Sequence, residues 1–181
     1  MPGRRILSLW FPHLGAERVL RRLGLPGEAC LGVVAEDGAR QVLSSVSPGA
    51  RAAGLAEGQA LRDAFAMCPQ LVVRPQDAPA EAAFLDALTR WGGRFSPWVA
   101  PEAPAALMLD ITGCAHLFGG EAAMMERAME DARALGLTAR AGLADTPGAA
   151  WALARFAGQG PAPAPAGDMI EQEARATRSR A

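Results

Sequence analysis

The sequence of 181 residues contains no lysine, no asparagine and no tyrosine. All 18 basic residues are therefore arginine, and 19 acidic residues bring the formal net charge to −1. A chain with so little net charge has no general electrostatic attraction to nucleic acid. Enrichment in arginine and alanine is typical of a GC-rich coding sequence, so a single arginine is not taken as functional on composition alone.

Cysteine and histidine are scarce, which limits metal and disulfide chemistry. Cys30, Cys68 and Cys114 are odd in number and far apart, and only His13 and His116 accompany them. No pair or quartet has the spacing of a zinc site, and a disulfide framework is not expected. The pattern predicts three reduced thiols in the cytosol, mostly buried as small apolar side chains.

Long hydrophobic runs are also missing. The apolar stretch at residues 6–14 follows Arg4 and Arg5, but Pro12 and His13 interrupt it and it is too short for a signal peptide with a cleavage site. No other run approaches the length of a membrane span. These features predict a cytoplasmic protein without a membrane-spanning segment.

Strand and helix patterns alternate along the chain up to about residue 158. Asp37-Gly38 between two apolar runs predicts a hairpin, and Ser47-Pro48 and Thr146-Pro147 are signals for a helix start. Strands are expected at 5–11, 31–35, 40–44, 71–74, 95–100, 106–111 and 137–143, and helices at 16–23, 48–54, 59–68, 79–91, 121–135 and 147–157. The order predicts an α+β fold with a mixed sheet, and the strongly apolar strand at 106–111 is expected to be central.

The last part of the chain has a different composition. Residues 161–165 read Pro-Ala-Pro-Ala-Pro, which is typical of a stiff extended linker. Residues 168–181 are charged and without periodicity, so disorder or marginal helix is expected there.

Common catalytic motifs are absent. The sequence has no phosphate-binding P-loop, no dinucleotide-binding glycine pattern and no nucleophile elbow. His13 and His116 lack an acid at ligand spacing, so packing or surface roles are favoured for both. Asp110 ends an apolar strand before Ile-Thr-Gly, where a turn or capping role is favoured over metal binding.

Five segments taken in order resemble the Y-family (translesion) DNA polymerases. They are the strand and turn at 6–16 (ILSLWFPHLGA), a fingers-like segment at 47–55 (SPGARAAGL), Ala-Leu at 60–61 with Cys-Pro-Gln-Leu-Val at 68–72, the palm-like segment at 107–113 (LMLDITG), and Ala-Gly-Leu-Ala at 141–144. The resemblance implies a mixed-sheet palm at 1–27 and 79–158 with a small helical fingers insertion at roughly 28–78. The thumb and little finger of the family would be absent, so the chain is expected to be an N-terminal portion. A generic α+β domain that shares only the fold is the alternative.

The departures from the family pattern predict loss of catalysis. Polymerases clamp two divalent cations with carboxylates from an Asp-x-Asp and an Asp-Glu pair. By the resemblance, Trp10 and Pro12 stand at the first pair and Ala105 and Ala106 at the second, and none of these side chains coordinates a metal. No acid lies between Arg5 and Glu17, so a shift in register does not restore the first pair.

Other family positions have changed as well. The aromatic residue that screens the sugar corresponds to Gly15 and the fingers tyrosine to Pro48. Arg51 matches the family arginine that contacts the triphosphate, and a retained phosphate contact and an idle exposed arginine are equally compatible with the sequence. No metal, no cofactor and no catalytic residue are expected.

Within the family, the resemblance extends to the inactive ImuB-like subgroup, through Trp-x-Pro at 10–12 and residues 145–155. It implies a non-catalytic adaptor in SOS and translesion repair. The partners of the intact protein would be a sliding clamp, a RecA-like accessory protein and an error-prone C-family polymerase, with weak or absent DNA binding by this portion. The alternative is an active nucleotidyl transferase that binds metal through Asp110, Asp63 and Glu102.

Overall fold

The computed structural model describes residues 3–158; the predicted linker and tail at 159–181 lie outside this range. The strands are β1 Ile6–Trp10, β2 Leu31–Asp37, β3 Arg40–Val46, β4 Val72–Pro75, β5 Trp98–Glu102, β6 Ala106–Asp110 and β7 Arg140–Ala144. The helices are α1 Leu14–Leu23, α2 Pro48–Ala52, α3 Leu61–Met67, α4 Ala78–Gly92, α5 Glu121–Ala134 and α6 Pro147–Phe156, with a 3₁₀ helix, η1, at Ala115–Phe118. In this range, each helix falls short of the length or hydrophobicity that a bilayer span requires.

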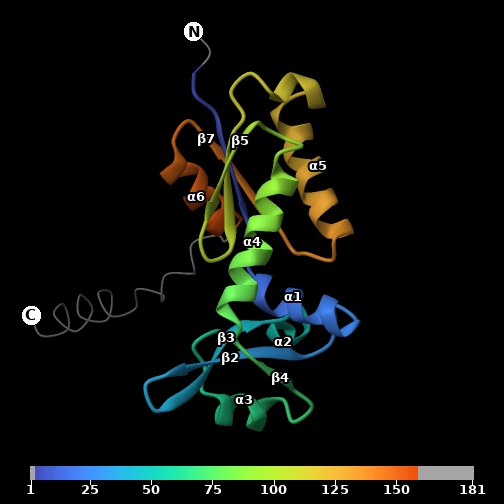
Figure 1. Cartoon of the computed structure of the whole chain (residues 1–181), viewed down its shortest axis with the longest axis vertical. Coiled ribbons are helices and arrows are strands. Elements are labelled where there is room, and N and C mark those ends of the chain that lie inside the picture. Colours follow the sequence, from blue (N-terminus) through green and yellow to red (C-terminus); the bar gives the residue numbers. More distant parts are fainter. Residues whose placement is uncertain (1–2, 159–181) are drawn as a thin grey trace, which may run out of the picture.

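The strands form two separate sheets. The four-stranded sheet has the order β5-β6-β1-β7 and all its neighbours are antiparallel, whereas the three-stranded sheet has the order β3-β2-β4 with β2 and β4 parallel. Figure 1 shows the four-stranded sheet in the upper half of the molecule and the three-stranded sheet in the lower half, with α4 running between them. The predicted α+β class with mixed strand directions is confirmed, and β6 is central as expected.

The core of the upper half follows from alternation along two central strands. Leu7 and Leu9 of β1 and Leu107 and Leu109 of β6 are fully buried and belong to one apolar cluster. Because alternate residues of a strand point to the same face, these side chains meet α4 and α5, which cover that face. Figure 1 shows α4 and α5 on one side of the sheet and α6 on the other.

Helix starts and the hairpin follow local sequence signals. The Ser47 hydroxyl accepts a hydrogen bond from the Ala50 amide at 3.0 Å and so caps α2. It also accepts from the Leu31 amide at 3.0 Å and donates to the Ala29 carbonyl at 2.7 Å, which fastens α2 to the start of β2. Gly38 turns the β2–β3 hairpin with a φ of 61°.

Some boundaries and orientations differ from the prediction. β5 begins at Trp98 rather than at residue 95, because Phe95 turns into the core and packs edge-on against Trp91 at 5.3 Å between ring centroids. β7 begins at Arg140 rather than at 137. On α5, Met124 is fully buried, whereas its neighbour Met125 is only partly buried.

A buried carboxylate explains the late start of β7. Glu17 on α1 accepts hydrogen bonds from the Thr138 amide and, at 2.6 Å, from the Thr138 hydroxyl, so these groups do not pair with a neighbouring strand. Burial raises the pKa of Glu17, and the hydrogen bonds from Thr138 oppose that rise. Glu17 thereby ties α1 to the segment that leads into β7.

Candidate functional site

One row of side chains crosses the end of the four-stranded sheet where β1 leads into α1. Glu102, Ala106, Trp10 and Arg140 are successive cross-strand partners in this row, on β5, β6, β1 and β7. Directly paired residues of antiparallel strands place their side chains on the same face. This row, called the end row below, therefore faces α6 rather than the core.

Helix α6 lies directly on this face because small residues allow close approach. Gly142, at the centre of β7, has the carbonyl oxygen of Ala150 and the amide nitrogen of Ala154 only 2.3 Å from where a Cβ atom would stand. Ser8 pairs with Gly142 and is fully buried, as are Ala150 and Ala154. A sheet surface without larger side chains at this point lets the helix backbone rest against the strand.

Two residues of α6 cover the end row with a cation and an indole ring. The Arg155 guanidinium carbon lies 4.2 Å from the centroid of the Trp151 ring and 5.3 Å from that of Trp10. Glu102 accepts a hydrogen bond from Arg155 at 3.0 Å and another from the Trp151 indole at 3.2 Å. Only 13% of the Arg155 side chain is exposed. The cation is therefore paired with a carboxylate and stacked on aromatic rings, as a largely buried arginine requires.

Arg140 adds a second guanidinium to the same face. Its central carbon lies 5.7 Å from the Trp10 ring centroid, and it donates a hydrogen bond to the Ala157 carbonyl just beyond α6. Trp10 thus has two arginines near its ring, while Glu102 is the one carboxylate of the end row. The face carries net positive charge.

A cavity of about 170 Å³ opens beside the end row, between the two sheets. Trp10, Pro12, Gly15 and Ala105 line it, so the structure brings three of the four predicted acid positions to one cavity. Ala105 also continues the β1–β6 pairing, since its carbonyl accepts from the Phe11 amide at 2.9 Å. Ala106 is the direct partner of Trp10. At Gly15 an added Cβ atom would stand 3.1 Å from atoms of Glu81 and Ser45, so a larger side chain would need its neighbours to move.

Charged side chains of both signs also line the cavity. Glu57, Glu81 and Arg18 line it together with Gln76, whose side-chain amide donates to Glu81 at 2.9 Å. Partial burial raises the pKa of Glu57, and the charge of Arg51 partly offsets that rise. Arg51 itself is exposed on α2, near Glu57.

His13 joins the two halves of the molecule. It is buried, and its Nδ1 atom donates to the Val46 carbonyl at 2.7 Å, at the end of β3. Burial lowers the pKa of His13, with a smaller contribution from the charge of Arg51. This is the packing role predicted for His13, whereas His116 is exposed on η1.

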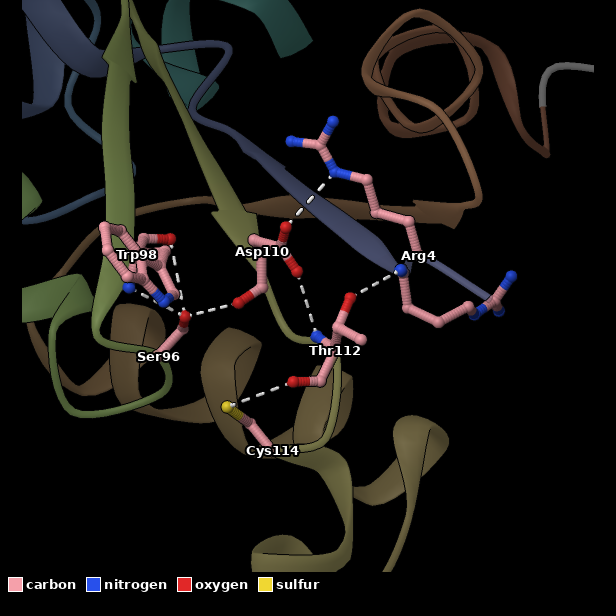
Figure 2. Close-up of polar contacts among 7 residues, drawn as sticks. Arg4, Ser96, Trp98, Asp110, Thr112 and Cys114 are labelled. Carbon is pink, nitrogen blue, oxygen red and sulfur yellow. Dashed lines mark hydrogen bonds and ion pairs between the residues drawn. The ribbon is translucent and has the colours of Figure 1, made fainter. Parts of the chain in front are cut away.

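Asp110 lies at the opposite end of the sheet from the end row. It is four residues along β6 from Ala106, a separation of about 13 Å in an extended strand. Its carboxylate accepts hydrogen bonds from the Thr112 amide at 3.1 Å and from Arg4 at 3.2 Å, while its main-chain carbonyl accepts from the Ser96 hydroxyl (Figure 2). Hydrogen bonds from Thr112, and then Arg4, lower the pKa of Asp110. The predicted turn role of Asp110 is confirmed.

The carboxylates of the alternative hypothesis do not converge. Glu102 lies in the end row, Asp110 lies at the far end of the same sheet, and Asp63 lies on α3 of the three-stranded half, beside Arg62 at 3.5 Å. In the part of the chain that the structure describes, no group of three or more histidine, cysteine, aspartate or glutamate side chains is arranged to hold a metal ion.

Comparison with known proteins agrees with the fold. The profile of the impB/mucB/samB family matches residues 17–155. The chain belongs to this family. It is 52% identical over 103 residues to the ImuB proteins of two Caulobacter vibrioides strains, which covers 57% of this chain and 22% of those proteins.

Solved polymerase structures share the same architecture. An insertion ternary complex of Dbh DNA polymerase superposes with a TM-score of 0.72 at 15% identity, and DinB from Sulfolobus solfataricus superposes with a TM-score of 0.68 at 17% identity. A Y-family Dbh–Dpo4 chimera gives 0.61 at 16% identity. Each match covers 83% of this chain and 45% of the polymerase chain, so the chain spans under half the length of these structures. The predicted Y-family resemblance is confirmed.

The end row does not suit the divalent cations that polymerase chemistry requires. Mg²⁺ prefers close to six oxygen ligands in octahedral geometry. The end row offers one carboxylate, Glu102, whose two oxygen atoms already accept from Trp151 and Arg155. Its other side chains are a methyl group, an indole and a guanidinium, and the last of these repels a metal ion.

Sequence reasoning missed Trp151, Arg155 and Arg140 as parts of this site. Trp151 and Arg155 are four residues apart on a predicted helix, a spacing that puts them on one face. That spacing was the available signal, but the partner they share, Glu102, lies 53 positions from Arg155 and was identified only by the fold.

Proposed function

We propose that this chain is the palm and fingers of a non-catalytic, ImuB-like Y-family homologue that acts as an adaptor in error-prone DNA repair. We place the palm at residues 1–27 and 79–158 and the fingers at 28–78. The observation that carries the proposal is the composition of the end row. At the end of the palm sheet where the family holds its metal-binding acids, Trp10 is paired with Ala106 and covered by Arg155.

The loss of metal-ion stabilisation of the transition state supports a loss of activity. Two cations stabilise the attacking and leaving oxygens in nucleotidyl transfer, and one metal is credited with several kcal/mol of transition-state stabilisation. With Trp10, Pro12, Ala105 and Ala106 at the family acid positions, this stabilisation has no source in the end row.

Arg51 is proposed as a remnant of triphosphate binding. It lies on α2, close enough to the cavity for its charge to affect Glu57 and His13. The same charge that would contact a phosphate here offsets neighbouring carboxylates, so we expect no measurable nucleotide affinity from Arg51 alone.

The partners of the intact protein are proposed from the ImuB likeness. A sliding clamp, a RecA-like accessory protein and an error-prone C-family polymerase would bind it in the cytoplasm, and the residues described here would contribute little DNA affinity. The likeness to ImuB, 52% identity over 103 residues, supports an accessory role in damage-induced mutagenesis. It covers 22% of ImuB, so surfaces elsewhere in the intact protein would carry most partner contacts.

Primer extension tests the proposal directly. The purified 181-residue chain is incubated with a primed template, four deoxynucleotides and Mg²⁺ or Mn²⁺, beside an active Y-family polymerase as the positive control. No extension is expected. Extension that disappears in Asp110→Ala or Glu102→Gln would overturn the adaptor proposal in favour of a working transferase.

A gain-of-function variant tests how far the site has degenerated. Replacing Trp10, Pro12, Ala105 and Ala106 by acids is expected to leave extension undetectable, because Gly15 and Pro48 lack the family's contacts to the sugar and the nucleotide. Measurable extension by that variant would show that the scaffold is more intact than proposed.

A further inference from the structure

One largely buried arginine, Arg155, lies on the face of the end row. Arg155 reaches the face of the end row from α6, where its guanidinium carbon lies 4.2 Å from the centroid of the Trp151 ring and 5.3 Å from that of Trp10, and its Nη2 atom donates to Glu102 at 3.0 Å. Its side chain is 87% buried, whereas Arg62, an arginine on α3, is 94% exposed. A buried guanidinium with both aromatic and carboxylate partners is held in one place rather than free to turn toward solvent.

We propose that Arg155 is an internal cation that occupies the metal position of the palm and keeps divalent ions out. The inference rests on the proposed function and extends it from missing acids to an added positive charge. The guanidinium neutralises Glu102, the end-row carboxylate, and lies near the ring of Trp10, at one of the positions where the family acids would stand.

Carboxylates restored at Trp10 and Ala106 would stand in the same row as Glu102, the carboxylate that Arg155 already binds. The guanidinium, 5.3 Å from the centroid of the Trp10 ring, would be the nearby cation for them. A guanidinium and a divalent ion would then compete for the same oxygens, and the internal partner is already in place without any loss of translational freedom. Metal binding should therefore need two changes, the return of acids and the removal of the Arg155 charge.

Arg155 also holds α6 against the sheet. Arg155 joins α6 to β5 through Glu102 and to β1 through Trp10, so it is also a positioning residue for this helix. Arg155→Met keeps most of the apolar stem but removes the charge and its stacking. The matched control is Arg62→Met, which changes the same residue type on an exposed surface.

Mn²⁺ binding followed by electron paramagnetic resonance tests the competition, with Mn²⁺ alone as the probe and the full chain as the protein. The double variant W10D/A106E is compared with W10D/A106E/R155M. Removal of one positive charge within contact distance is expected to tighten Mn²⁺ binding by about tenfold or more. Adding Glu102→Gln to the triple variant should weaken the binding again.

Equal Mn²⁺ affinity with and without Arg155 would overturn the inference and leave the proposed function untouched. Mn²⁺ binding by the unaltered chain, together with primer extension, would overturn the proposed function itself. If the variants with acids do not fold, Mn²⁺ binding by Arg155→Met, in which Glu102 has lost its guanidinium partner, is compared with Mn²⁺ binding by Arg62→Met. Tighter binding by Arg155→Met is expected, and equal binding by the two variants would refute the proposal.

Discussion

Gly142→Ala is expected to separate α6 from the four-stranded sheet. An alanine Cβ atom at this position of β7 would stand 2.3 Å from the Ala150 carbonyl oxygen and 2.3 Å from the Ala154 amide nitrogen. Both are backbone atoms of a regular helix, so no side-chain rotation relieves the clash. Ordinary contact begins near 3.4 Å, and α6 must therefore move outward by roughly 1 Å.

The cost follows from what that movement breaks. Excess atoms in a packed interior typically cost about 1–3 kcal/mol. A gap of about 1 Å additionally forfeits up to roughly half of the dispersion energy of each contact across it. Arg155 would also move away from Glu102 and Trp10. We expect a loss of about 3 kcal/mol or more in the free energy of unfolding, and a Tm lower by roughly 6–12 °C for a domain of this size.

Urea unfolding followed by circular dichroism measures the change, and tryptophan emission reports on Trp10 and Trp151. Gly148→Ala is the matched control, because it makes the same substitution on α6 where an added Cβ meets no atom within 4 Å. It should be neutral or stabilise by up to about 1 kcal/mol through helix propensity. A Gly142→Ala protein within about 0.5 kcal/mol of the unaltered chain would refute the close helix–strand packing described here.

Three further outcomes test other contacts. Ser47→Ala should lower the free energy of unfolding by about 2 kcal/mol, because it removes the cap of α2 and leaves buried main-chain groups unpaired. Ser44→Ala, the control, should change the free energy of unfolding by less than about 1 kcal/mol in the same urea titration. Because the pKa of Glu17 is raised in the folded state, its contribution to stability is fully present below the unfolded pKa of about 4.3 and is lost as pH rises through the folded pKa. Glu17→Gln should therefore flatten the dependence of unfolding free energy on pH above about pH 4. An unchanged dependence on pH would contradict the burial of this carboxyl group. Because the pKa of Asp110 is lowered in the folded state, its contribution to stability is present above about pH 3.9 and is lost as pH falls through the folded pKa. Asp110→Asn should therefore reduce the fall in Tm between about pH 4 and pH 2. An equal fall in Tm for both proteins would argue against the bonds from Thr112 and Arg4.

Local signals in the sequence predicted most of the elements. Ser47-Pro48 and Thr146-Pro147 start helices through side-chain caps, and Gly38 turns the hairpin, because each effect depends on neighbours in the chain. The prediction was wrong for the start of the strand at 95–100. Phe95 has a strand-forming side chain, but burial against Trp91 offers more apolar contact than a place in the sheet.

Contacts between distant segments could not be predicted in this way. Cys30 and Cys68 are 38 positions apart, yet Cys30 packs against the apolar cluster that contains Cys68, and burial is the main cause of the raised pKa of Cys68. Both thiols are free, as predicted, but nothing in their spacing indicated that they meet. Glu17 and Thr138 give a second example, separated by 121 positions.

The sequence by itself determined that β1 brings no carboxylate to the palm, because no acid stands between Arg5 and Glu17 in any register. It also determined most of the helices, the strands and the hairpin turn, though not the starts of β5 and β7, since caps, turns and periodicity act over a few residues. Only the tertiary structure decided what stands there instead. Strand pairing set Glu102, Ala106, Trp10 and Arg140 in one row, and the absence of a side chain at Gly142 let α6 bring Arg155 down onto it. Such a constellation depends on packing between segments far apart in the chain, which no local pattern encodes.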